Sequence, residues 1–95
     1  VIIRDSLMSS AFIRPNPNNG IFTVMIKNVN SSNESFSVVI YDGKGSRVYS
    51  KIFSDVSKSN PYLEVKASNL AKGQYTLVVF DKSGEKKEAG KLLIQ

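Results

Sequence analysis

The chain has 95 residues and a net charge of +5, from 13 Lys and Arg against 8 Asp and Glu. A chain of this length forms one domain and buries enough surface to fold without covalent cross-links. Because it contains no Cys and no His, disulfides, thiolate nucleophiles, imidazole bases and the common zinc ligand sets are excluded.

The N-terminal end of the sequence is predicted to be a linker or junction. Residues 1–10 show no hydrophobic period, which suggests a tether or a partly committed first edge strand. Because the chain does not begin with Met, we expect a piece of a longer protein. The folded domain is expected to cover residues 11–95. It begins with a short strand at 11–14 that Pro15 ends, because proline lacks an N–H group.

A dense turn signal follows at residues 15–20. Pro15 and Pro17 fix two φ angles, Asn16 belongs to a group of asparagines able to mimic turns, and Gly20 accepts a positive φ. These residues predict a compact reversal of the chain.

The middle of the chain reads as alternating strands. Residues 21–27 have apolar side chains at every second position, and so do residues 36–41. The turn residues Asp42 and Gly45 lead into a partner strand at 47–53, so a hairpin is predicted. A short strand at 62–65 comes next.

Leu70, Gly73 and Tyr75 stand at the start of a further strand. This pattern predicts a tyrosine corner, in which the phenol hydroxyl bonds to upstream backbone and fixes a crossover between two sheets. A last turn at 82–85 and a closing strand at about 88–94 complete the series. Strands at this spacing, without helical periodicity, predict an all-β immunoglobulin-like antiparallel sandwich of about seven strands with Greek-key connections.

No catalytic, metal or cofactor site is predicted. Neither the turn with Asp42 nor the turn with Asp81 and Glu85 offers more than two carboxylates, whereas calcium takes six or more oxygens. The lysines near the end of the chain alternate with acidic residues, which is typical of a solvated hairpin, and we expect no nucleic-acid binding. No apolar run approaches the roughly 20 residues of a membrane span.

Four segments together resemble the type A C-terminal sorting domain of the type IX (Por) secretion system: residues 15–24, 39–48, 69–79 and 91–95. The resemblance implies a non-catalytic signal that carries a fused N-terminal cargo through the periplasm and the outer-membrane translocon. Outer-membrane shuttle and sortase proteins would be its partners. In the family a surface sortase commonly removes the domain and can attach the cargo to an anionic lipopolysaccharide, so the cargo reaches the surface or the extracellular space.

The recognition residues are expected at the C-terminus, in the set Lys91, Leu92, Leu93, Ile94 and Gln95. We expect the final strand to offer an exposed sheet edge for main-chain hydrogen bonds with a receptor, with one of its faces buried in the domain. Two other hypotheses stay open. The domain could instead be an immunoglobulin-like or fibronectin-like module for a polysaccharide or protein, or it could associate weakly with itself through the last strand.

Overall fold

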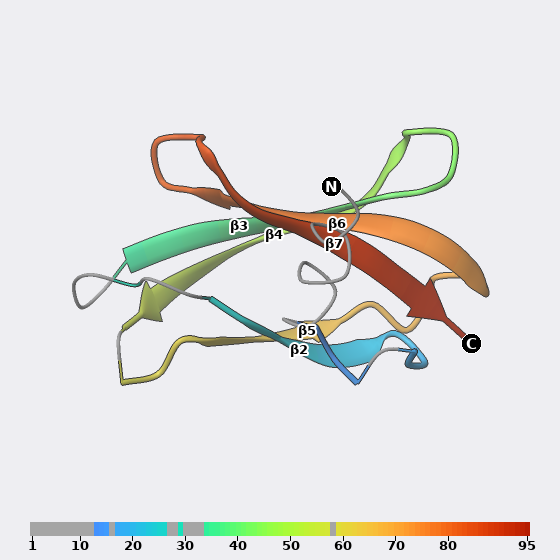
Figure 1. The fold of residues 1–95 in the computed structure, drawn as a ribbon, viewed down its shortest axis with the longest axis horizontal. Helices are drawn as coiled ribbons and strands as arrows, with labels where there is room; N and C mark the ends of the chain where they lie inside the picture. Colours follow the sequence, from blue (N-terminus) through green and yellow to red (C-terminus); the bar gives the residue numbers. More distant parts are fainter. Residues whose placement is uncertain (1–12, 16, 27–28, 30–33, 58) are drawn as a thin grey trace, which may run out of the picture.

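A computed structural model describes residues 13–15, 17–26, 29, 34–57 and 59–95 of the chain. The predicted linker at 1–10 and the motif residue Asn16 lie outside the described residues. The described part contains seven strands and no helix (Figure 1): β1 (Ile13–Arg14), β2 (Ile21–Met25), β3 (Glu34–Tyr41), β4 (Arg47–Val56), β5 (Tyr62–Lys66), β6 (Gly73–Asp81) and β7 (Lys86–Ile94).

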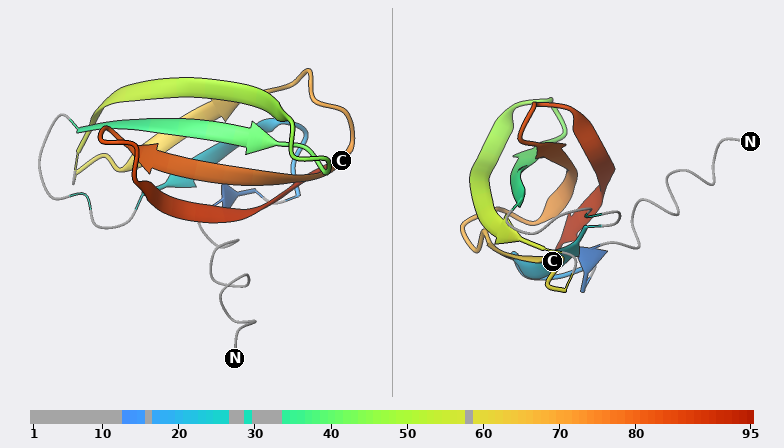
Figure 2. Two further views of the ribbon diagram at one scale, coloured as in Figure 1. Left: turned by 90° about the horizontal axis from the view of Figure 1, so that it is seen from above. Right: turned by 90° about the vertical axis from the view of Figure 1, so that its left-hand side faces the viewer.

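The strands form two antiparallel sheets that pack face to face (Figure 2). The smaller sheet has the order β1-β2-β5 and the larger sheet has the order β4-β3-β6-β7. Hairpins join β3 to β4 and β6 to β7, whereas the chain changes sheets after β2, after β4 and after β5. The predicted immunoglobulin-like sandwich with Greek-key connections is confirmed.

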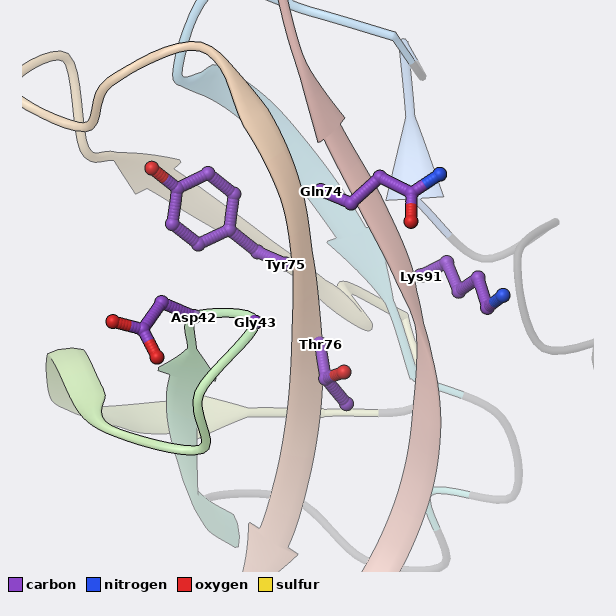
Figure 3. Close-up of a pocket in the computed structure, with 6 residues that line it drawn as sticks. All are labelled: Asp42, Gly43, Gln74, Tyr75, Thr76 and Lys91. Atoms are coloured by element: carbon purple, nitrogen blue, oxygen red, sulfur yellow. The ribbon is translucent and has the colours of Figure 1, made fainter.

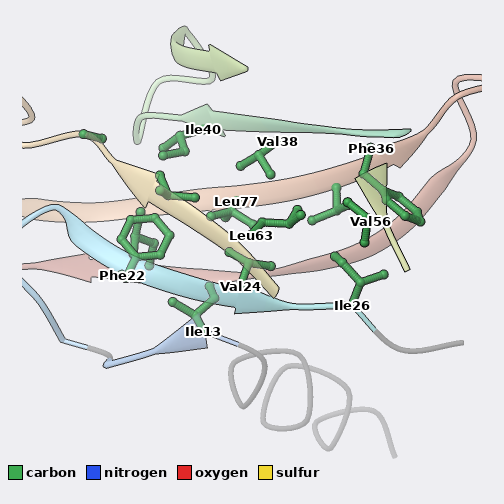
Figure 4. Close-up of a cluster of buried hydrophobic side chains, with 14 of the residues drawn as sticks. Ile13, Phe22, Val24, Ile26, Phe36, Val38, Ile40, Val56, Leu63 and Leu77 are labelled. Atoms are coloured by element: carbon green, nitrogen blue, oxygen red, sulfur yellow. The ribbon is translucent and has the colours of Figure 1, made fainter. Parts of the chain in front are cut away.

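The core lies between the two sheets and is built by the inward half of each alternating strand (Figure 4). Phe22 and Val24 face it from the smaller sheet, and Val38 and Leu77 face it from the larger sheet, each exposed by 2% or less. Full burial of a side chain of this size stabilises the fold by about 1.5–3 kcal/mol. The alternation in the sequence therefore identified the inward faces correctly.

The two hairpins of the larger sheet close with the same turn chemistry. Asp42 Oδ1 accepts hydrogen bonds of 2.9 Å from the backbone N–H groups of Lys44 and Ser46. Asp81 Oδ1 likewise accepts hydrogen bonds of 2.9 Å from the N–H groups two and four residues further on, and one of 2.6 Å from the Ser83 hydroxyl. Both carboxylates thus hold together the turns in which they lie.

These contacts favour the ionised form of both carboxylates. The backbone N–H groups of Ser46 and Lys44 hold the pKa of Asp42 below its ordinary value of 3.8. The Ser83 hydroxyl, followed by the backbone N–H of Glu85, lowers the pKa of Asp81. Since the unfolded carboxyl binds protons more readily, this stabilising contribution is present above the unfolded pKa and is lost as the pH falls through the folded pKa.

The tyrosine corner forms as predicted. The Tyr75 hydroxyl donates a hydrogen bond of 2.6 Å to the carbonyl of Ala71, four residues earlier. The Tyr75 ring and Leu70 are partly buried against the core. The corner therefore ties the crossover that follows β5 to the start of β6.

Tyr75→Phe should lower the free energy of unfolding by about 1 kcal/mol, because it removes this hydroxyl bond and keeps the ring. Urea denaturation measures the loss. Tyr62→Phe is the matched control, since Tyr62 is 55% exposed on the other sheet, and it should stay within about 0.5 kcal/mol of the wild type. Equal midpoints for Tyr75→Phe and the wild type would remove the corner as a stabilising element.

The urea midpoint of the wild type should fall when the pH drops below 3.8, the ordinary carboxyl pKa, because the unfolded carboxyls of Asp42 and Asp81 then bind protons, whereas the folded ones stay ionised until the pH falls through their lower pKa. The double variant Asp42→Asn/Asp81→Asn should have a lower midpoint at pH 7 and a flatter acid dependence. Glu64→Gln serves as the control, since it removes an exposed carboxyl outside both turns. An unchanged acid dependence in the double variant contradicts the assignment.

Candidate functional site

The last strand sends its side chains alternately into the core and away from it. Leu92 and Ile94 are buried, with 0% and 3% exposure, and belong to the core cluster. Lys91 and Gln95 are exposed, and Leu93 is partly buried. Of the five residues predicted for recognition, two thus build the core, and Lys91 and Gln95 present the most accessible side chains.

The loop around Asn18 lies along the end of this strand. The backbone N–H of Asn18 donates to the carbonyl of Leu93 at 3.0 Å, and the N–H of Gln95 donates to the carbonyl of Asn18 at 2.8 Å. Asn18 and Ile94 therefore form a parallel bridge. The expectation of an open edge along the whole final strand is wrong at residues 93–95, because Asn18 already occupies the outward main-chain groups of Leu93 and Gln95.

The side chain of Asn18 holds its own loop together. Its Nδ2 donates to the carbonyl of Pro15 at 2.7 Å, and its Oδ1 accepts from the N–H of Gly20 at 2.7 Å. Asn18 is 8% exposed and is the buried polar residue of the described chain. With both ends of its amide bonded, it avoids the cost of a buried unsatisfied polar group. The sequence predicted a turn here but gave no signal for the contact with the distant tail.

Gly20 fixes the other end of the loop. Its φ is +104°, and a Cβ atom added there would lie 2.6 Å from the carbonyl oxygen of Ala67. The backbone N–H of Ala67 donates to the carbonyl of Gly20 at 2.7 Å, so the two segments are in direct main-chain contact. The position needs glycine for both its conformation and its space.

A shallow hollow of about 100 Å³ opens where the tail meets the tyrosine corner (Figure 3). It is formed by the turn after β3, the start of β6 and the tail strand β7. Its lining residues are Asp42, Gly43, Gln74, Tyr75, Thr76 and Lys91. The fold thereby gathers three of the sequence segments singled out above at one end of the sandwich.

The predicted motif residues fall into two groups around this end. Pro15, Pro17 and Gly20 shape the loop beside the tail. Gly45, with a φ of +86°, completes the turn that begins at Asp42, and Gly73 begins β6. Among the described residues, no group of three or more acidic side chains is placed to hold a metal ion.

These features define a small antiparallel β-sandwich module. The loop that contains the buried Asn18 closes the edge of its last strand. A family model described as the secretion system C-terminal sorting domain matches residues 13–95. The chain belongs to this family, the C-terminal sorting domains of the type IX (Por) system. Neither a curated protein nor a solved structure matched the sequence.

Membership of this family makes the domain a C-terminal sorting signal for type IX secretion. It implies interaction with the secretion machinery and export to the cell surface or the extracellular space. No helix in the described ranges is long and apolar enough to cross a bilayer.

Gly20→Ala should destabilise the domain by about 3 kcal/mol or more, since it combines a left-handed backbone with a clash against main chain. Two matched variants separate these causes in urea denaturation. Gly45→Ala keeps the strain at φ +86° in open space and should cost about 1–2 kcal/mol. Gly43→Ala has neither feature and should stay within about 0.5 kcal/mol. Equal effects at Gly20 and Gly45 would show that the contact with Ala67 is unimportant.

Proposed function

We propose that the domain is a non-catalytic signal that targets a fused N-terminal cargo to the type IX outer-membrane translocon, for surface anchoring or release. The observation that carries the proposal is the family match over residues 13–95. In this proposal residues 11–95 form the sorting domain and residues 1–10 form the linker to the cargo. The partners are the outer-membrane shuttle and sortase proteins.

The recognised surface in this proposal is the end of the sandwich where the loop meets the tail. Lys91 and Gln95 are exposed there, and Pro17 and Asn19 are exposed on the adjoining loop. Leu92 and Ile94 act from the core by holding the strand in register. The receptor thus reads a folded surface that combines residues from both ends of the domain.

The pairing of the tail favours side-chain recognition over strand addition at its last residues. On one side, β7 pairs with β6 from Ile94 opposite Gly73 back to Lys86 opposite Phe80. On the other side, Asn18 bonds to Leu93 and Gln95. A receptor that added a strand at residues 93–95 would first have to displace the loop.

Removal of residues 91–95 should block export of a cargo that carries this domain, while the cargo itself remains folded. This deletion also removes Leu92 and Ile94 from the core, so it tests the signal as a whole. Cell fractionation in a type IX host measures the cargo at the surface and in the medium. Normal delivery of the truncated cargo would contradict the sorting function.

Point variants test recognition without loss of the core. Lys91→Glu combined with Gln95→Ala should lower delivery by about tenfold and leave the urea midpoint near that of the wild type. Lys66→Glu is the matched control, since it reverses an exposed lysine on the other sheet and should be delivered normally. Equal delivery of both variants would place the recognised surface elsewhere.

A further inference from the structure

The outer face of the four-stranded sheet, the face turned away from the core, has an apolar centre. Cross-strand register places Ser50, Val39, Val78 and Ala89 in one row across the four strands. Val39 and Val78 are only 6% and 8% exposed, yet neither belongs to the core cluster. The centre of this face is therefore largely covered, although it lies outside the core.

Larger apolar side chains flank this central row. Ile52, Ser37 and Phe80 form the adjacent row, on the side of the sheet that ends at the β6–β7 turn. Ile52 is 68% exposed and Val48 is 38% exposed, both on the edge strand β4. An exposed isoleucine beside a covered valine row is suited to insertion into a partner's pocket.

Cations occupy the corners of the same face. Arg47 is paired with Tyr41, and Lys91 is paired with Thr76, so they stand at the two ends of one row. Lys86, paired with Phe80, stands at a third corner.

No carboxylate occupies any of the three rows. The carboxylates of Asp42 and Asp81 lie in the turns at the ends of the sheet, outside these rows. The charged side chains within the three rows are therefore all cations.

The outer face of the other sheet lacks this separation of charge. Its pairs are Ile21 with Lys66, Thr23 with Glu64, and Met25 with Tyr62, so charges of both signs alternate there. Its exposed apolar residues, Ile21 at 48% and Tyr62 at 55%, resemble Ile52 in exposure. It therefore supplies matched control positions.

We propose that the outer face of the four-stranded sheet binds a protein of the secretion machinery. The partner's surface would be an apolar patch rimmed by Asp and Glu. The inference rests on the proposed sorting function and gives the secretion machinery a second contact surface besides the tail. Charge complementarity selects this occupant over a second copy of the domain, because two such faces would bring Arg47 and Lys86 against like charges.

The test uses cargo fused to the full chain in a type IX host, with delivery measured by fractionation. Ile52→Ser and the pair Arg47→Glu/Lys86→Glu should each lower delivery by about tenfold. Their controls are Ile21→Ser and the pair Arg14→Glu/Lys66→Glu, which make the same changes on the other sheet and should deliver within about twofold of the wild type. Urea midpoints confirm that each variant is folded.

The outcomes separate this inference from the sorting function. If deletion of residues 91–95 blocks delivery but Ile52→Ser and Arg47→Glu/Lys86→Glu deliver like their controls, only the docking face is wrong. If the deletion has no effect, the sorting function is wrong.

Two further measurements can overturn the choice of occupant. Binding of the chain to phosphatidylglycerol vesicles that Arg47→Glu/Lys86→Glu abolishes would assign the face to a lipid surface. A dimer in light scattering that Ile52→Ser dissociates would assign it to a second copy. A monomer without vesicle binding supports the acidic protein partner.

Discussion

The hydrogen bonds of Asn18 connect the beginning of the domain to its end. Its backbone pairs with Leu93 and Gln95, while its side-chain amide spans the loop from Pro15 to Gly20. A buried amide with all of these partners in place fixes one arrangement, because any slip of the loop or the tail would leave polar groups unsatisfied. The exposed residues of the tail depend on this arrangement for their position.

In the proposed function, stability and recognition depend on the same strand. In β7, Leu92 and Ile94 fill the core, and Lys91 projects outward. The alternation of a strand makes this division unavoidable, since consecutive side chains point to opposite faces. Substitutions of the tail therefore affect folding and receptor binding separately only when they are confined to the outward positions.

Local chemistry explains what the sequence could predict. Alternating residues gave the strands and their inward faces, and the spacing from Leu70 to Tyr75 gave the corner whose hydroxyl reaches back only four residues. The contact of Asn18 with the tail could not be predicted in this way, because a turn signal does not say which distant edge the turn meets. The covered valines of the outer face, Val39 and Val78, were likewise invisible, since their burial depends on neighbours from other strands.

The bridge between Asn18 and Ile94 also constrains the order of folding. Its two residues lie almost at opposite ends of the described chain, so the entropy of closing this loop must be overcome before the contact can form. Sandwiches dominated by such distant pairings fold slowly, on a scale of about milliseconds to seconds. The end of the sandwich is therefore complete only in fully folded molecules, and a receptor that reads this end would discriminate against chains whose folding is unfinished.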